Sequence, residues 1–141
     1  GVQLEVGSVA TDFEHRSFAQ ELALCQRYCQ AIIHYAQHQG IVIGHSEGNN
    51  TAEVMIPFKT QMRSTPTFTF GGTLSGALRI YERGGIVTNV TSISIERTGY
   101  DVAKMQITVA DTSLTNGNAN LFYFNDNPST PAERLIYSAE L

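Results

Sequence analysis

Residues 86–109, IVTNVTSISIERTGYDVAKMQITV, decide the fold of this chain, because they contain two runs in which apolar and polar side chains alternate. Such a period of two predicts β-strands with one buried face. Thr98-Gly99 predicts a turn between the two runs. A change of register near Thr91-Ser92 predicts a β-bulge in the first run. The residues expected to point inward are Val90, Ile93 and Ile95, and the apolar residues of the second run are Val102, Met105, Ile107 and Val109.

Outward from this pair, the same alternation recurs in short segments separated by clusters of Gly, Asn, Asp, Ser and Pro. The segments expected to be strands are 41–43, 51–58, 67–70, 77–82, 86–97, 100–110, 120–124 and 134–139. This pattern predicts a mainly β fold, in which residues 41–141 form an antiparallel, jelly-roll-like β-sandwich. Helices do not alternate with these strands, which argues against a parallel sheet.

Residues 17–39 are expected to form one amphipathic helix that precedes the sandwich and joins it in one domain. Ser17 is the predicted N-cap, and Gln20 follows it three residues later, as a capping box requires. Apolar residues then recur with the 3-4 spacing of a heptad seam, by which a helix packs against copies of itself. The alternative is that this helix covers the sandwich of a monomer. The predicted oligomer seam is Leu22, Cys25, Cys29, Ile32 and Ala36.

The composition limits the class of protein. A chain of 141 residues is long enough for one domain with its own core. Charged residues make up 16% of the chain, below the ~25% of typical domains, which suits a β-rich extracellular or virion protein. The net charge is −4 without a Lys/Arg run, so no nucleic-acid partner is expected. No apolar run approaches the ~20 residues that membrane insertion requires.

The cysteines and histidines do not make up a complete metal site. Cys25 and Cys29 are four residues apart, but no third ligand stands at a zinc-like spacing. They are expected to be small apolar seam residues whose thiols stay reduced in the cytoplasm. His34 and His38 have the same spacing without the glutamate of HExxH, so they are expected on a solvated helix face. No metal and no other cofactor is predicted.

The sequence predicts no catalytic residues. A glycosidase needs two carboxyl groups that flank a cleft. The acidic candidates are instead scattered over strand ends and loops, and no nucleophile-elbow, phosphate-loop or dinucleotide motif occurs. These candidates are Glu82, Glu96, Asp101, Asp111 and Asp126.

Carbohydrate binding is the more specific functional prediction. Proteins hold sugars with aromatic rings against the C–H faces, and with planar polar groups on the hydroxyls. The segment 122–124 is aromatic and is followed at once by an Asn/Asp-rich loop, while two further tyrosines lie near turns. The alternative is that these rings are core residues and that the Asn and Asp residues only form turns. The predicted sugar-binding residues are Tyr81, Tyr100, Asn118, Tyr123, Asn125 and Asp126.

Residues 3–28 read QLEVGSVATDFEHRSFAQELALCQRY. This stretch resembles LExGSxATxFExRxxxxELxLCQRY, a junction that recurs in phage virion proteins, mainly tail fibres and tailspikes. The resemblance implies that residues 1–16 are a linker strand and junction from an upstream domain of a longer protein. It also implies a homotrimer that folds in the host cytoplasm and is mounted on the virion tail, with any polysaccharide cleavage located in another domain.

Three functional hypotheses follow. The first is a C-terminal domain of a tail fibre or tailspike that trimerises and binds a bacterial surface glycan, its receptor, without catalysis. The second is a purely structural domain that trimerises and caps the fibre. The third is a small glycan hydrolase or lyase, which would need two carboxyl groups that converge in a cleft.

Overall fold

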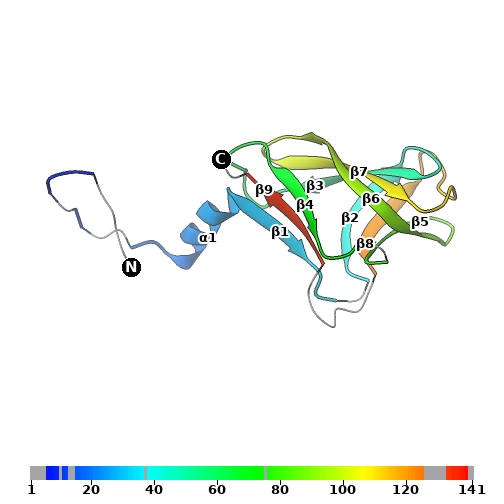
Figure 1. The fold of residues 1–141 in the computed structure, drawn as a ribbon, viewed down its shortest axis with the longest axis horizontal. Coiled ribbons are helices and arrows are strands. Elements are labelled where there is room, and N and C mark those ends of the chain that lie inside the picture. The colour runs from blue at the N-terminus through cyan, green and yellow to red at the C-terminus, as the bar shows by residue number, and fades with distance from the viewer. Residues whose placement is uncertain are drawn as a thin grey trace.

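A computed structural model of the chain describes residues 6–9, 11–12, 15–36, 38–74, 76–125 and 133–139 (Figure 1). The predicted linker strand at the start of the chain lies largely outside these residues, as does Asp126. The elements are α1 (Phe18–Gln26), β1 (Cys29–Ile33), β2 (Gly40–Ser46), β3 (Thr51–Pro57), β4 (Thr67–Gly71), β5 (Leu78–Glu82), β6 (Ile86–Thr98), β7 (Val102–Val109), β8 (Ala119–Phe124) and β9 (Arg134–Ser138).

Six of the strands form a closed barrel in the order β2-β3-β7-β6-β5-β8, in which neighbours are antiparallel. The predicted mainly β, antiparallel fold is therefore confirmed, but the predicted sandwich is wrong. The bulge expected near Thr91-Ser92 is present, because the β6–β7 register shifts between Val90 and Ser92. A second shift on β6 and one on β2 add to the bending, and bulges of this kind curve a sheet until its edges meet.

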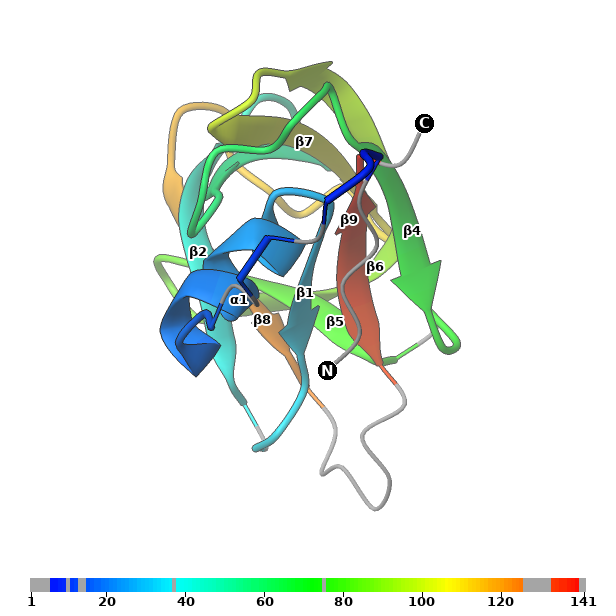
Figure 2. The same ribbon diagram turned by 90° about the vertical axis from the view of Figure 1, so that its left-hand side faces the viewer.

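The remaining strands form a three-stranded sheet in the order β1-β9-β4, next to α1 and at one end of the barrel (Figures 1 and 2). The C-terminal strand β9 is its centre, since Ser138 pairs with Cys29 on one side and with Thr67 on the other. Tyr137 of β9 packs its ring against Phe58 and Phe68, at centroid distances of 5.1 and 5.5 Å. This sheet therefore shares one hydrophobic core with the barrel.

Alternation along the strands places most of the core as the sequence predicts, except that Val102 is half-buried on the opposite face of β7 and its neighbour Ala103 is buried. On β7 the buried residues are Ala103, Met105, Ile107 and Val109, while the residues between them are half-buried. Val90 is fully buried, and Ile93 and Ile95 pack against the core as half-buried residues. The hydrophobic effect of these inward side chains accounts for most of the stability of such a barrel.

The predicted helix over residues 17–39 is wrong in length, because α1 ends at Gln26 and Cys29–Ile33 is strand β1. The predicted start is confirmed: the Ser17 hydroxyl accepts from the backbone N–H of Gln20 at 3.3 Å, and the capping box is complete. The residues after Arg27 form a strand instead, because β1 makes five residue pairs with β9. Such long-range pairing overrides the local helical propensity of the sequence. The predicted seam is therefore divided between a helix, a strand and the segment after it.

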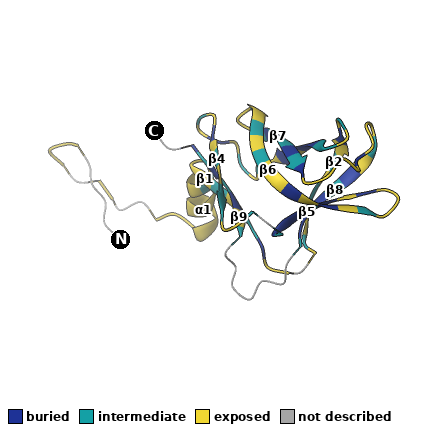
Figure 3. Ribbon diagram, turned by 45° about the vertical axis from the view of Figure 1, so that its right-hand side comes forward, coloured by how far each residue is buried: buried dark blue, intermediate teal, exposed yellow. Residues whose placement is uncertain are grey.

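The helix α1 has no buried residue (Figure 3). Phe18 is 82% exposed, and Leu22, Leu24 and Tyr28 are exposed as well. At the end of α1, the guanidinium group of Arg63 lies 4.8 Å from the centroid of the Tyr28 ring. The Tyr28 carbonyl also accepts from the backbone N–H of Ala139 at 2.7 Å. This end of α1 is thus anchored to the rest of the fold, while its apolar side chains stay uncovered within the described chain.

Candidate functional site

A shallow hollow lies on the outside of the barrel, over β5, β6 and β8. Along β5, Leu78, Ile80 and Glu82 are fully buried inside the barrel, so that the alternate residues Arg79 and Tyr81 point outward. We call this surface the outer-face hollow. It is lined by His38, Arg79, Tyr81, Val87, Leu121 and Tyr123.

The strand register arranges the side chains of this surface in two rows across three strands. The polar row consists of Tyr123, Arg79 and Asn89. The apolar row consists of Leu121, Tyr81 and Val87. The two rows are two residues apart along β5, which corresponds to about 7 Å at the rise of a β-strand. A ring-sized ligand could therefore contact both rows at once.

Two of the predicted sugar-binding tyrosines meet in the outer-face hollow, but they contribute differently. Tyr81 is 44% exposed and offers its ring to a ligand, whereas Tyr123 is only 8% exposed. The His38 ring meets the Tyr123 ring edge to face at a centroid distance of 6.0 Å, so these two rings form one wall of the hollow. Tyr81 is thus the more accessible of the two rings.

Arg79 supplies the charge of the outer-face hollow. Its Nε donates to the Asn89 Oδ1 at 2.8 Å, and within the described residues it makes no ion pair with a carboxylate. A guanidinium held through Nε keeps the donors of its two terminal nitrogens for a ligand. The sequence prediction missed Arg79, although its position two residues before Tyr81 on an alternating strand places both side chains on one face.

His38 was expected on a solvated helix face, but it is exposed in a turn between β1 and β2, and it was missed as a residue of this hollow. It adopts a left-handed backbone conformation with φ 56°, which is uncommon for a residue other than glycine. The neighbouring Gln39 holds this turn, because its side chain accepts from the backbone N–H of Tyr35 at 2.8 Å and donates to the carbonyl of Ile33 at 3.2 Å. This turn places His38 at the rim of the hollow.

The other predicted sugar-binding residues lie outside the outer-face hollow. Tyr100 is exposed in the turn between β6 and β7. The amide groups of Asn118 and Asn125 donate to the Glu82 carboxylate at 2.9 Å and to the Gly76 carbonyl at 3.2 Å. Asp126 lies outside the described residues.

Glu82 is a fully buried carboxylate at one end of the barrel. It accepts hydrogen bonds from the Ser46 hydroxyl at 2.6 Å, from the Asn118 amide at 2.9 Å and from the backbone N–H of Thr115 at 3.1 Å. Burial raises the pKa of Glu82, but these hydrogen bonds outweigh it and hold that pKa below its ordinary value. Glu82 therefore serves the barrel as an ionised, fully bonded group.

Three other described carboxylates, those of Glu53, Glu96 and Asp111, have local partners. The Lys104 ammonium lies 2.6 Å from the Glu53 carboxylate and 2.8 Å from that of Glu96, and it lowers the pKa of Glu53. Asp111 accepts from the Ser113 hydroxyl, which lowers the pKa of Asp111. None of these groups lines the outer-face hollow.

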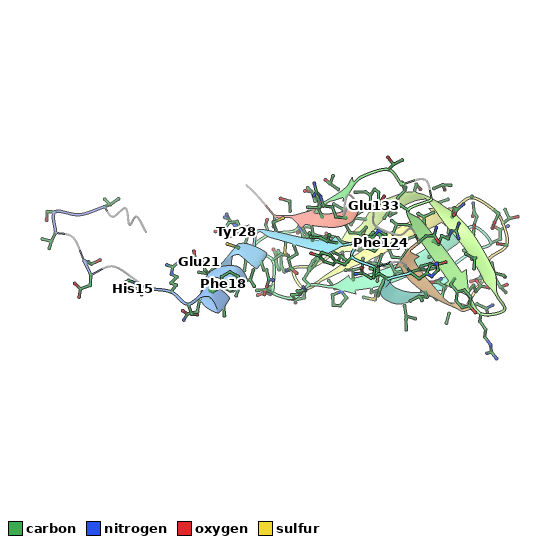
Figure 4. The ribbon with its side chains drawn as sticks, turned by 90° about the horizontal axis from the view of Figure 1, so that it is seen from below. His15, Phe18, Glu21, Tyr28, Phe124 and Glu133 are labelled. Carbon is green, nitrogen blue, oxygen red and sulfur yellow. The ribbon has the colours of Figure 1, made fainter. Side chains whose placement is uncertain are left out.

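The expectation that His34 lies on a solvated helix face is wrong. His34 follows β1 directly and is completely buried, with its ring stacked on Phe124 at a centroid distance of 4.7 Å. Its Nδ1 lies 3.2 Å from a carboxylate oxygen of Glu133, and its Nε2 lies 3.0 Å from the carbonyl of Ala36. Figure 4 labels Phe124 and Glu133, two of the residues that contact this ring. His34 thus stabilises the segment between β1 and β2.

The free thiols of Cys25 and Cys29 are exposed. In the described part of the chain, no three His, Cys, Asp or Glu side chains are grouped so that they could hold a metal ion.

A second hollow, the α1 cleft, lies between α1 and the body of the fold. The buried Tyr137 hydroxyl has no hydrogen-bond partner among the described residues. The Gln30 side chain closes one side of the cleft, since it donates to the Thr60 carbonyl at 2.7 Å and accepts from the backbone N–H of Lys59 at 2.8 Å. The apolar residues lining this cleft include Leu22, Cys29, Ile32, Ile56, Phe58 and Tyr137.

Comparison with known protein families, with curated proteins and with solved structures gives no match to this chain. Among the described residues, no helix has the length and apolar character required to cross a membrane. What the chain does is therefore inferred from the geometry of its own residues.

Proposed function

We propose that this chain is the C-terminal domain of a phage tail fibre or tailspike, a homotrimer that binds bacterial surface carbohydrate without catalysing a reaction. The outer-face hollow carries this proposal, because it sets the exposed ring of Tyr81 beside the guanidinium group of Arg79. Aromatic rings stack on the C–H faces of sugars, and planar donors bind their hydroxyl groups. The proposal places the protein on the phage tail after folding in the host cytoplasm, where thiols stay reduced.

The position of the outer-face hollow favours binding. Its residues are held by strands of a closed barrel, and side chains on such a scaffold are pre-organised, which lowers the entropic cost of binding. One shallow hollow of this kind would bind a sugar weakly. Three copies on one rigid fibre would bind a repetitive cell-surface glycan with increased avidity.

The exposed helix α1 supports self-association. A free helix of nine residues is marginal in water, and α1 buries none of its side chains within the described chain. Phe18 and Leu24 would be covered if α1 met other copies of the chain, as the trimer requires. This contact replaces the longer seam predicted from the sequence, since Cys29 and Ile32 belong to β1.

The proposal that this chain is not an enzyme is supported by the state of three of its described carboxylates. Glu82 is buried and saturated by hydrogen bonds, and Glu53 and Glu96 share Lys104. A hydrolase or lyase would need two carboxyl groups that face a bound glycan. The outer-face hollow is lined by none.

A structural cap of the fibre is the second candidate, and the exposed apolar side chains of α1 favour it equally. The two functions differ in one measurement, which is the binding of the whole chain to isolated surface polysaccharides and lipopolysaccharides of bacteria. Tyr81→Ala should abolish this binding, because it removes the stacking ring. The matched control is Tyr100→Ala, which removes an exposed tyrosine outside the hollow. Undiminished binding by Tyr81→Ala would refute the hollow as the site, and no binding by the native chain would favour the structural cap.

A further inference from the structure

We infer that the outer-face hollow is selective for acidic carbohydrate, with Arg79 binding the carboxylate of a uronic or sialic acid residue while Tyr81 stacks on its ring. This inference rests on the proposed carbohydrate-binding function and adds the chemical class of the ligand. It depends on the orientation of Arg79, on the distribution of charge around it and on the spacing of the two rows.

Arg79 is oriented before any ligand binds. The hydrogen bond from its Nε to Asn89 at 2.8 Å fixes the plane of the guanidinium group, and Asn89 lies directly opposite Arg79 in the β5–β6 register. The two terminal nitrogens make no hydrogen bond or ion pair with the described residues, and together they form a planar fork. Such a fork matches the two oxygens of a carboxylate, and charged bidentate pairs are roughly twice as strong as neutral hydrogen bonds.

The charge of Arg79 is not neutralised by the described part of its own chain. Lys104 lies between Glu53 and Glu96, whereas Arg79 has no carboxylate within ion-pair distance among the described residues. None of the six residues that line the outer-face hollow is acidic. Glu82 is on the same strand, but its side chain is buried inside the barrel. In a chain with a net charge of −4, this hollow is a local site for an anion.

The two rows match the two parts of an acidic sugar. The polar row carries Arg79, and the apolar row carries Tyr81 with Val87 and Leu121 on either side. The rows are about 7 Å apart along the strand. An acidic pyranose could therefore lay one C–H face on Tyr81 while its carboxylate reached Arg79.

The test measures binding of polygalacturonate, hyaluronan and polysialic acid to the whole 141-residue chain, coupled at high density to particles. The carboxyl-reduced form of each polymer, together with neutral dextran and mannan, is measured in parallel. Arg79→Gln removes the fork, and the control Arg83→Gln removes an equal charge from the exposed turn after β5. Melting temperatures of both variants should match the native chain.

We expect at least one acidic polymer to bind, and its carboxyl-reduced form to bind at least about tenfold more weakly, as the loss of a charged hydrogen-bond pair predicts. Arg79→Gln should cause a similar loss, while Arg83→Gln should change binding less than about twofold. Equal loss in both variants, or equal binding of acidic and reduced polymers, would overturn the acid selectivity. If neutral polymers bind and only Tyr81→Ala abolishes this binding, the acid selectivity fails while the proposed function stands. If the native chain binds none of these polymers, the result counts against the acid selectivity and against the proposed carbohydrate binding.

Discussion

The Ser46 hydroxyl donates a 2.6 Å hydrogen bond to the Glu82 carboxylate, and both residues are completely buried. They belong to β2 and β5, which are separated in the barrel by β8. Asn120 of β8 lies opposite Glu82 in the strand register and donates to the Ser46 hydroxyl at 3.3 Å. The Glu82 carboxylate and the Ser46 hydroxyl therefore link three neighbouring strands, β5, β8 and β2, at one end of the barrel.

Glu82→Gln should destabilise the barrel. The amide group is of similar size but carries no charge, and its NH2 would face the donors of Ser46, Thr115 or Asn118. Loss of a charged, buried acceptor costs about 2 kcal/mol or more in the free energy of unfolding. Urea denaturation at neutral pH measures this loss. The exposed Glu47→Gln is the control, and equal stability of the two variants would show that the Glu82 network contributes little.

Acid should lower the stability of the native chain. The pKa of Glu82 is lower in the folded chain than its ordinary value of 4.5, because its hydrogen bonds outweigh the effect of burial. The folded state therefore binds the proton more weakly than the unfolded state. The stabilisation that ionised Glu82 contributes is therefore complete at a pH above its ordinary pKa. It is lost as the pH falls through the pKa of Glu82 in the folded chain. Urea midpoints between about pH 7 and about pH 3 should fall for the native chain and fall less steeply for Glu82→Gln. Parallel curves for the two proteins would contradict this assignment.

Lys104→Gln should destabilise the outer wall of the barrel at neutral pH. Without the ammonium group, the carboxylates of Glu53 and Glu96 lose their shared partner, and the pKa of Glu53 is no longer lowered by Lys104. The stability difference from the native chain should shrink in acid, as Glu53 takes up a proton in both proteins. Lys59→Gln, at an exposed position, is the control. A difference that does not change with pH would assign the effect to packing of the lysine stem.

Gly44→Ala should disrupt the contact between β2 and β3. A Cβ atom at Gly44 would overlap the backbone oxygen of Glu53 on the facing strand, so the backbone would have to move. Strain of this kind typically lowers the free energy of unfolding by about 1–3 kcal/mol. Gly40→Ala in the same strand is the control, because its Cβ would make an ordinary 3.6 Å contact with Leu121. Equal thermal stability of the two variants would contradict the close approach at Gly44.

Phe18→Asp should convert the proposed trimer to a monomer. The native chain should have a mass of three times 15.5 kDa by light scattering after size exclusion. A charge at the exposed position of Phe18 would be buried in the contact between α1 helices. Ala19→Asp is the control, since it adds the same charge one residue along the helix. A monomeric native chain, or a trimer that tolerates Phe18→Asp, would refute the α1 contact. Ile32→Asp is less informative, because Ile32 packs against the core of its own chain.

The features that were predicted correctly depend on interactions within a few residues. Alternation identified β6 and β7 and most of their inward residues, because successive side chains on a strand point to opposite faces whatever lies beyond them. The capping box at Ser17 and Gln20 was identified for a similar reason, since both of its hydrogen bonds span three residues. At the candidate site, Tyr81 was proposed from its place near a turn and Tyr123 from the aromatic segment before an Asn/Asp-rich loop, and their role in binding stays a prediction.

Local sequence patterns could not predict which distant segments pair with one another. The residues of β1 have both a helical 3-4 spacing and the Ile32-Ile33 pair typical of a strand, and only their pairing with β9 selects the strand. Arg79 became a site residue because β5 lies between β6 and β8, an order that alternation does not specify.

Local patterns thus determined that the chain forms antiparallel strands and which face of most of them is apolar. They did not determine whether the two sheet edges close, since inward and outward residues alternate in a sandwich and in a barrel alike. Closure depends on the pairing of β2 with β8, in which Val42 lies opposite Phe122, a residue far from it in the sequence. The bulges in the β6–β7 and β2–β8 pairs add the bending that this contact requires, and the Ser46–Glu82 hydrogen bond links β2 to β5 beside it.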